Sequence, residues 1–483
     1  MRKRNEKGEV VRYKARLVAQ GFSQRPDIDY VETYSPVVDA ITFRYLINLA
    51  VHEKLEMRLM DVVTAYLYGS LDHDIFMKIP EAFKVPEAYK SSQETCSIKL
   101  QKSLYGLKQS GRMWYNRLSQ FLLNEGYKND PICPCVFIKR SGSEFVIIAV
   151  YVDDLNIIGT PKELSKAVEC LTKEFEMKDL GKTKFCLGLQ IEHLTNGIFV
   201  HQSTYTEKVL KRFYMDKSHP LSTPMVVRSL DIHKDPFRPK ENDEELLGDE
   251  TPYLSAIGAL MYLANNTRPD ICFAVSLLAR FSSSPTKRHW NGVKQIFRYL
   301  RGTIDMRLFY SNKSKSEMIG YADAGYLSDP HKARSQTGYL FTYGGTAISW
   351  RSMKQTLAAT SSNHAEIIAI HEASRECVWL RSMTQHIQEM CGFSLKKDIP
   401  TILYEDNAAC IAQLKGGYIK GDRTKHISPK FFFTHDLEKK GEIDVQQIRS
   451  VDNLADLFTK ALPTSTFEKL VFKIGMRRLR EIK

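Results

Sequence analysis

The sequence lacks any apolar run approaching 18 residues and lacks an N-terminal secretion signal. A membrane-spanning helix needs about 20 apolar residues, and a signal peptide needs an apolar core behind a basic start. We therefore expect a protein that neither crosses a membrane nor is secreted. The nine cysteines are an odd number, and none form the Cys-x-x-Cys pairs that bind zinc. This disfavours a structural zinc site and favours a reduced, intracellular protein.

The overall composition excludes no globular class, because hydrophobic residues make up 43% and charged residues 26% of the chain. A length of 483 residues suggests two to four domains, since one domain takes roughly 100–200 residues. The 69 basic residues outnumber the 56 acidic ones and give a net charge of +13. Such a charge favours a polyanionic partner, most commonly nucleic acid, although other soluble basic proteins share it.

Residues 144–159 combine two apolar runs with a pair of adjacent acids. Phe145–Val150 and Leu155–Ile158 are rich in valine and isoleucine, which is typical of buried strands. Asp153 and Asp154 lie between these runs, where a hairpin has to turn. Like charges this close, at the rim of an apolar sheet, are unfavourable unless a cation joins them, and a divalent metal with oxygen ligands suits them. The alternative for any Asp-Asp pair is a solvated turn.

The segment Tyr151-Val152-Asp153-Asp154 after an apolar strand resembles the active-site hairpin of reverse transcriptases. Nearly the whole chain is similar to the polymerase and RNase H portion of Ty1/copia-type retrotransposon polyproteins. This resemblance implies a multidomain α+β and α/β protein, with a right-hand polymerase, a helical connection and an RNase H-like domain. The expected divisions are fingers and palm, N-terminally incomplete, at 1–225; a linker and helical thumb or connection at 226–312; the RNase H-like domain at 313–475; and a basic tail at 476–483.

The resemblance implies that Asp61 joins the aspartate pair in the polymerase centre. Asp61 lies near the end of a predicted strand, Met57–Val62, where a lone aspartate is otherwise an ordinary turn residue. By analogy with the family, Asp61 and Asp153 would hold two Mg²⁺ ions, with Asp154 as a supporting acid. Mn²⁺ is the alternative metal.

Other positions match family segments that contact the substrate. Lys14 and Arg16 are candidates for binding the incoming triphosphate, although a solvated strand face explains them equally well. Tyr66 matches the aromatic position under the nucleotide sugar, where a ring would select deoxynucleotides; a core aromatic is the alternative. Residues 104–111 match the segment that grips the template and the primer terminus. The full expected substrate set is Lys14, Arg16, Tyr66, Tyr105, Gly106, Lys108, Gln109 and Tyr151.

Hydrophobic periodicity predicts three helices in the first half of the chain, over residues 42–54, 112–125 and 163–176. A basic hairpin is expected within residues 1–25, with Val10–Tyr13 and Ala15–Ala19 as its strands and a polar turn at Asn5–Gly8. Two further strands should pair across Asn196-Gly197, because this dipeptide is typical of a type I′ hairpin turn. Residues 216–250 are polar, contain four prolines and are expected to form a linker, followed by a helical region over 252–302.

In the last third of the chain, three strands are followed by alternating helices and strands, which is the element order of an RNase H fold. Four acids fall on this pattern. Asp323 is expected to end the first strand, Glu366 to open the first long helix, Asp406 to follow the fourth strand and Asp456 to lie early in the last helix. Each has an ordinary alternative, namely a capping box for Glu366, a helix cap for Asp406 and a favourable helix dipole for Asp456.

All four acids match family motifs, so the resemblance implies a nuclease centre that holds two divalent cations about 3.5–4 Å apart. Many RNase H enzymes carry a histidine on the loop before the last aspartate, but residues 449–452 contain none. His426 matches a copia-family motif instead, and would either contact substrate or simply begin a helix.

The function implied by the resemblance is an RNA-directed DNA polymerase with RNase H activity, which copies RNA into DNA and degrades the RNA of the resulting hybrid. The implied partners are an RNA template, a DNA primer, the RNA–DNA hybrid, dNTPs, and the capsid and integrase of the same element. The expected location is a cytoplasmic virus-like particle, with the nucleus as the alternative. Because the family pattern extends upstream of Met1, we expect a fragment of a larger element. Two rivals therefore stay open, a nuclease without polymerase activity and an inactive relic that binds nucleic acid.

Overall fold

A computed structural model describes residues 2–4, 10–13, 15–80, 83, 96–228, 231–248, 250–314, 317–393, 399–416 and 428–482. Two candidate substrate residues, Lys14 and His426, lie outside this described part. The chain forms two compact units. The first unit is built from residues 1–39, 56–183 and 390–392, and the second from residues 40–55, 184–389 and 393–483.

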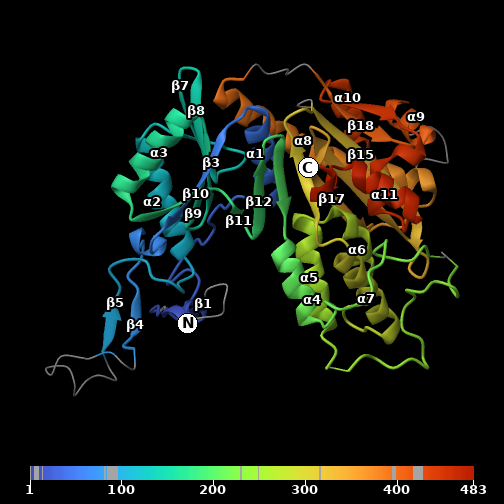
Figure 1. The fold of residues 1–483 in the computed structure, drawn as a ribbon, viewed down its shortest axis with the longest axis horizontal. Coiled ribbons are helices and arrows are strands. Elements are labelled where there is room, and N and C mark those ends of the chain that lie inside the picture. Colours follow the sequence, from blue (N-terminus) through green and yellow to red (C-terminus); the bar gives the residue numbers. More distant parts are fainter. Residues whose placement is uncertain are drawn as a thin grey trace. The chain divides into compact units, whose positions relative to one another are not determined.

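The first unit is organised around a six-stranded antiparallel sheet (Figure 1). Its strands in spatial order are β10 (Met177–Lys182), β3 (Glu56–Val62), β9 (Asp154–Gly159), β8 (Glu144–Tyr151), β7 (Val136–Ser141) and β6 (Lys128–Asn129). The two strands expected around the aspartate pair, β8 and β9, are thus the central strands. Two helices accompany the sheet, α2 (Ser110–Asn124) and α3 (Pro161–Glu174).

One face of this sheet packs against α2 and α3. Val146, Ile148 and Val150 of β8 are buried in one cluster with Leu118 of α2 and Leu171 of α3. Alternate residues of a strand point to one face, so these three valine and isoleucine side chains share the helix-covered side. The burial fixes the register of the β8–β9 hairpin, because a slip by one residue would turn every one of them to the other face.

Smaller elements complete the first unit. β1 (Arg2–Arg4) pairs with β2 (Val10–Tyr13), so a basic hairpin forms within residues 1–25 and the predicted strand Val10–Tyr13 is confirmed. Its partner is Arg2–Arg4, and the expected strand Ala15–Ala19 does not form. β4 (Phe76–Lys78) pairs with β5 (Ser97–Lys99). A short 3-10 helix, η2 (Ala65–Tyr68), follows β3.

The second unit contains a five-stranded sheet and most of the helices. The strands in spatial order are β11 (Phe185–Cys186), β12 (Leu189–Leu194), β13 (Gly197–His201), β14 (Met306–Ser311) and β20 (Met476–Arg478). The accompanying helices are α1 (Ala40–His52), α4 (Ser203–Arg212), α5 (Tyr253–Asn266), α6 (Cys272–Ala279) and α7 (Lys287–Gly302). Helices α5 to α7 occupy the region predicted to be helical.

The β12–β13 hairpin forms, but its turn lies one residue earlier than the sequence suggested. Leu194 pairs with Gly197, so the two turn residues are Thr195 and Asn196. Gly197 has a φ of +153°, and a Cβ atom there would lie 2.1 Å from the carbonyl oxygen of Tyr310 in β14. The glycine is therefore required by the close approach of a neighbouring strand rather than by the turn itself.

A second five-stranded sheet follows in the same unit, in the order β17 (Thr346–Lys354), β16 (Arg334–Tyr343), β15 (Met318–Asp329), β18 (Thr401–Glu405) and β19 (Ile443–Gln447). The first three strands are antiparallel neighbours, whereas β18 runs parallel to both β15 and β19. Its helices are α8 (Ser362–Cys391), α9 (Ala408–Gly416), α10 (Phe433–Lys439) and α11 (Thr464–Lys473). This arrangement fits the element order predicted for an RNase H fold.

Two details of the second sheet differ from the prediction. Asp323 lies in the middle of β15 rather than at its end, because the hairpin with β16 continues to Asp329. Asp456 lies in a short 3-10 helix, η7 (Leu454–Phe458), and α11 follows it, so the predicted last helix is neither α-helical nor last.

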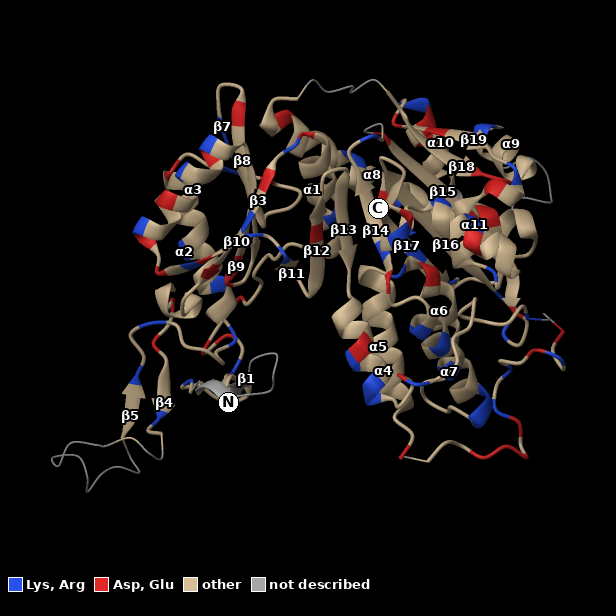
Figure 2. Ribbon diagram, viewed as in Figure 1, with Lys and Arg blue, Asp and Glu red and all other residues tan. Residues whose placement is uncertain are grey.

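Charge is spread over both units. Figure 2 shows Lys and Arg interspersed with Asp and Glu along the chain rather than gathered in one segment. Within the part of the chain that the structure describes, no helix combines the length and the apolar character needed to cross a bilayer.

Candidate active sites

The β8–β9 hairpin turns at Val152 and Asp153, and Tyr151 pairs with Asp154 across the turn. Val152 has a φ of +56°. This left-handed conformation costs a β-branched residue on the order of 1–2 kcal/mol. The buried indole of Trp114 in α2 donates a 2.7 Å hydrogen bond to the carbonyl oxygen of Val152. Trp114 therefore holds the acidic turn in place, a role that the sequence did not indicate.

Asp61 of β3 lies directly opposite Asp154 of β9 in the sheet. The backbone N–H of Val62 donates to the carbonyl oxygen of Asp153 at 2.8 Å. The structure thus brings the three predicted polymerase acids together from two distant parts of the chain. Burial, followed by the charges of Asp153 and Asp61, raises the pKa of Asp154 to about 6. A cation already neighbours the group, since Lys178 Nζ lies 3.4 Å from Asp61 Oδ2.

Three of the predicted substrate residues gather beside these acids. The ring centres of Tyr66 in η2 and Tyr105 are 4.8 Å apart. The guanidinium carbon of Arg16 lies 5.0 Å from the centre of the Tyr105 ring. Burial raises the pKa of the Tyr66 hydroxyl, and the charge of Asp153 raises it further, which reflects their proximity. A basic side chain, two rings and the acids therefore belong to one local surface.

Of the remaining predicted substrate residues, two support the backbone framework and two are exposed. Gly106 has a φ of +97°, and a Cβ atom there would lie 2.1 Å from the carbonyl oxygen of Ala19, so this glycine permits two segments to cross closely. Gln109 is buried, and its amide donates a 2.9 Å hydrogen bond to a backbone carbonyl of the N-terminal segment. Both positions support the framework. The side chains of Lys108 and Tyr151 are exposed.

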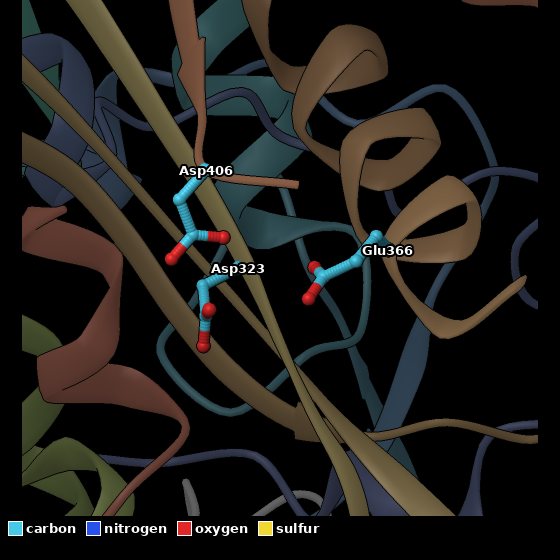
Figure 3. Close-up of side chains that lie close together, drawn as sticks. All are labelled: Asp323, Glu366 and Asp406. Atoms are coloured by element: carbon cyan, nitrogen blue, oxygen red, sulfur yellow. The ribbon is translucent and has the colours of Figure 1, made fainter. Parts of the chain in front are cut away.

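Three acids of the second unit converge. Asp323 of β15, Glu366 of α8 and Asp406, which follows β18, each offer a carboxylate oxygen within 4.8 Å of the others. Figure 3 shows the three side chains close together, with the carboxylate of Glu366 directed from its helix toward the two aspartates. Asp323 and Glu366 are buried and Asp406 is half-buried. Among the described residues no other group of three potential metal ligands is this close, the polymerase acids included.

Asp456 joins this group through a lysine. Lys460 Nζ lies 2.6 Å from Asp456 Oδ1 and 3.2 Å from Asp323 Oδ1. The hydroxyl of Thr459 donates to the other oxygen of Asp323. The side chain of Asn453 donates a 2.8 Å hydrogen bond to the backbone carbonyl of the residue before Asp323. The turn that carries Asp456 is thereby fastened to β15.

The capping explanations for Glu366 and Asp406 do not apply in the structure, whereas Asp456 does lie in the first turn of η7, where the helix dipole favours an acid. Other side chains accept the backbone N–H groups at the helix starts, namely Ser361 for α8 at 3.1 Å, Asn407 for α9 at 3.0 Å and Asn453 for η7 at 3.1 Å. Glu366, Asp406 and Asp456 are therefore not needed as helix caps.

Burial and mutual repulsion control the protonation of the four acids of the second unit. Burial, followed by the charges of Glu405 and Asp323, raises the pKa of Glu366 well above its ordinary value. Burial and then Asp323 raise the pKa of Asp456 to about 7. Oε2 of Glu366 is buried without a hydrogen-bond partner. A crowded, buried carboxylate set with an unpartnered oxygen fits a divalent cation, which prefers oxygen ligands and would relieve the repulsion.

Glu405 and Lys460 are residues that sequence reasoning missed. Glu405, at the end of β18, is fully buried; its Oε1 accepts the backbone N–H groups of Asp406 and Asn407 at 3.2 and 3.1 Å, and its Oε2 has no partner. Burial raises its pKa well above the ordinary value. The signal that could have indicated Glu405 was its position next to Asp406, which puts two adjacent acids at the end of a predicted strand. For Lys460 the signal was its four-residue spacing from Asp456, which in the predicted helix would place both side chains on one face.

Mg²⁺ binding to the four acids of the second unit is expected to weaken as the pH falls. The raised pKa values of Asp456, about 7, and of Glu366 mean that both carry protons in the metal-free protein at low pH, and a cation must displace them. Each displaced proton lowers the affinity by up to about tenfold per pH unit below its pKa. We expect the dissociation constant for Mg²⁺, measured by isothermal titration calorimetry, to rise at least about tenfold from pH 8 to pH 6. Asp456→Asn should reduce this dependence; an unchanged dependence would contradict the assignment.

Lys460 is expected to compete with a cation for Asp323 and Asp456, because its ammonium lies within hydrogen-bond distance of both. Lys460→Met keeps the apolar stem and removes the charge. We expect this variant to bind Mn²⁺ about tenfold more tightly without nucleic acid, as measured by electron paramagnetic resonance titration. The matched control is Lys469→Met, which removes a half-exposed lysine paired with Asp452 and should leave the affinity unchanged. Equal affinities in the two variants would rule out competition.

Comparison with known proteins shows which protein family the chain resembles. Residues 1–227 match the family model described as reverse transcriptase (RNA-dependent DNA polymerase). The chain is 38% identical over 472 residues to the retrovirus-related Pol polyprotein from transposon TNT 1-94 of Nicotiana tabacum, covering 97% of this chain and 34% of that protein. It is 33% identical over 480 residues to the corresponding polyprotein from transposon RE1 of Arabidopsis thaliana, covering 99% and 31%.

More distant matches were also found. The transposon Ty1-DR1 Gag-Pol polyprotein of Saccharomyces cerevisiae is 26% identical over 478 residues, covering 95% of this chain and 26% of that protein. The solved structure of LC11-RNase H1, isolated from compost by a metagenomic approach, aligns with 32% of this chain and 99% of its own, at 17% identity and a TM-score of 0.22. The chain spans about a third of the length of the two plant relatives. It is therefore a homologue of the Pol polyproteins of copia-type transposons, with a reverse transcriptase family segment in residues 1–227.

Proposed function

We propose that the chain is the reverse transcriptase and RNase H portion of a copia-type retrotransposon Pol protein, which copies RNA into DNA and degrades the RNA of the hybrid. The observation that carries this proposal is the convergence of Asp323, Glu366 and Asp406, whose carboxylate oxygens lie within 4.8 Å of one another. The proposed divisions are a polymerase at 1–225, a connection at 226–312, a nuclease at 313–475 and a basic tail at 476–483.

In the proposed nuclease, Asp323, Glu366, Asp406 and Asp456 would hold two Mg²⁺ ions, or Mn²⁺. Such ions, when bound, lower the pKa of an attacking water and neutralise charge on the leaving 3′-oxygen. The contribution of the chain itself is to fix the ligands, since Thr459 donates to one oxygen of Asp323 and Asn453 donates to the backbone carbonyl before it. Selection of an RNA–DNA hybrid would rest on its shape and on the 2′-OH groups rather than on base sequence.

In the proposed polymerase, Asp61 and Asp153 would hold the metal ions, and Asp154 would support them. Arg16 would bind the triphosphate of a dNTP, because a guanidinium donates to phosphate oxygens in a fork. The ring of Tyr66 would lie under the sugar and exclude a ribose 2′-OH. The proposed substrates are an RNA template and a DNA primer, and the proposed setting is a virus-like particle shared with the capsid and integrase of the same element.

A Mg²⁺-dependence assay on the purified chain tests this proposal. A labelled DNA primer annealed to an RNA template reports extension, and a label on the RNA reports cleavage in the same sample. We expect both activities with Mg²⁺ and neither with EDTA. Cleavage without extension would replace the proposal by a nuclease, and hybrid binding that is independent of metal, with neither activity, would replace it by a passive binder.

A further inference from the structure

A pocket of about 120 Å³ in the second unit is lined by none of the acids described above. Its wall combines residues from the predicted linker, from α6 and the segment after it, and from the ends of β15 and β17. The charged lining consists of five basic side chains and two aspartates, namely Arg228, Lys240, Arg280, Lys332, Lys354, Asp235 and Asp329. The lining therefore carries three more positive than negative charges.

Two arginines form the inner wall of this pocket. Arg228 and Asp235 are paired there, with Nε 3.2 Å from Oδ1, and their side chains are 5% and 0% exposed. Arg280 Nη1 lies 3.4 Å from Asp329 Oδ2, with the two side chains 10% and 11% exposed. Each aspartate has a second basic neighbour, since His331 Nε2 lies 3.4 Å from Asp235 Oδ2 and Lys354 Nζ lies 3.9 Å from Asp329 Oδ2, so the two acids do not balance the basic groups around them.

The inner wall also has unused hydrogen-bonding capacity. Nε of Arg280 is buried and has no hydrogen-bond partner. Burial, with the charge of Arg228 acting in the same direction, lowers the pKa of Arg280 to about 10 although Asp329 opposes this. Burial, followed by the charges of Arg280 and Lys332, likewise lowers the pKa of Lys354, against the attraction of Asp329. The basic groups therefore repel one another in a space that excludes much of the solvent, and an anion would relieve this repulsion.

We propose that this pocket binds a phosphate group between Arg228, Arg280 and Lys354. A guanidinium presents paired donors that match the oxygens of phosphate, and Arg280 has a buried donor to spare. The volume corresponds to about four water molecules, at roughly 30 Å³ each, which admits an anion of five non-hydrogen atoms. The exposed rim, with Lys240, Ser283 and Lys332, leaves the pocket open to solvent.

The phosphate has two possible sources, a phosphodiester in the backbone of a bound nucleic-acid strand or free phosphate. Binding of a nucleic-acid phosphodiester rests on the proposed function, whereas binding of free phosphate does not. The pocket itself is tested with the full chain and inorganic phosphate, by thermal unfolding at constant ionic strength with chloride as the reference anion. We expect a saturable rise in melting temperature with phosphate, and at least a tenfold weaker apparent affinity in Arg280→Gln.

Because Arg280→Gln leaves Asp329 without its closest arginine, a second variant is needed. Lys354→Met removes a lysine that is one-third exposed and 3.9 Å from Asp329, and it should also weaken phosphate binding. Arg298→Gln is the matched control, since its guanidinium donates to the carbonyl oxygen of His219 outside the pocket. No stabilisation specific to phosphate, or equal stabilisation of the wild type and both pocket variants, would overturn the proposal.

The source is then identified by binding a labelled RNA–DNA hybrid in EDTA, so that neither polymerisation nor cleavage is required. If the pocket holds a backbone phosphate, Lys354→Met should reduce the slope of log affinity against log salt by about 0.9, and free phosphate should compete with the hybrid. An unchanged slope together with retained phosphate binding assigns the pocket to free phosphate. Loss of catalysis in any of these proteins would bear on the proposed function and not on the pocket.

Discussion

Replacing Glu366 by glutamine is expected to lower hybrid cleavage by about 1,000-fold or more and to leave primer extension unchanged. Glu366 supplies one of the three carboxylates that lie within 4.8 Å of one another, and a neutral amide cannot replace its charge at a cation. A loss of about 4 kcal/mol of transition-state stabilisation corresponds to this factor. Single-turnover cleavage of a labelled hybrid at saturating Mg²⁺ measures the effect. Extension should persist because the acids of the proposed polymerase centre lie in the other compact unit.

The same variant is also expected to be more stable than the wild type without metal at pH 8, but not at pH 4. The folded-state pKa of Glu366 is raised, so folding favours its protonated form. The cost of ionising the buried group is absent at low pH, develops as the pH rises above the ordinary value of 4.5, and is complete above the raised value. Glutamine carries no charge at any pH and avoids this cost.

Thermal unfolding in EDTA at both pH values measures this second effect. Glu468→Gln, on an exposed position of α11, is the matched control and should change neither stability nor cleavage. Cleavage at the wild-type rate by Glu366→Gln would remove Glu366 from the nuclease. Lost cleavage combined with a lower melting temperature at pH 8 would instead indicate a damaged fold.

The second large effect is expected for Asp153→Asn, which should lower primer extension by about 1,000-fold or more and leave hybrid cleavage intact. Asp153 lies on the turn whose backbone is bonded to β3 beside Asp61, so its carboxylate belongs to the proposed metal site. Asp154→Asn is the matched comparison one residue further along. Its pKa of about 6 means that part of the population is already neutral near that pH, and a smaller loss, about tenfold, is expected.

Incorporation of a labelled dNTP on an RNA template measures the loss, and retained hybrid cleavage shows that the variant is folded. Equal losses in Asp153→Asn and Asp154→Asn would contradict their separate roles. Extension by Asp153→Asn at the wild-type rate would exclude this hairpin as the polymerase centre.

Much of this architecture was predictable because its signals are local. The runs Phe145–Val150 and Leu155–Ile158 consist of residues that favour buried strands, and they form the centre of the first sheet. The order of three strands followed by alternating helices and strands was also predicted for the second sheet, although the segment expected as the last helix is the 3-10 helix η7 and α11 was not foreseen. Choosing Asp323, Glu366 and Asp406 as a group depended on family motifs, because each is an ordinary cap or turn residue when taken singly.

The features that could not be predicted depend on contacts between distant segments. Trp114 supports the turn at Val152 from another element, and nothing in either segment indicates that bond. The turn lies at Thr195 and Asn196, one residue earlier than predicted, because Gly197 belongs to β13, where it permits the close approach of β14. Lys460 reaches Asp323 across 137 positions of sequence, so only the folded chain reveals the pair.

Helix α1 has a consequence for how the chain acquires its structure. It precedes β3 of the first unit in sequence, yet it is part of the second unit, where Phe43, Leu46 and Ile47 are fully buried. Arg44 of this helix donates to the carbonyl oxygen of Ile348 at 2.7 Å and to that of Asn266 at 2.8 Å. On the ribosome, α1 must therefore wait for some 300 further residues before its native partner at Ile348 emerges. A polypeptide ending near residue 183 would carry this helix with its apolar side uncovered and would be prone to aggregate, whereas one starting at residue 184 would lack a piece of its own core.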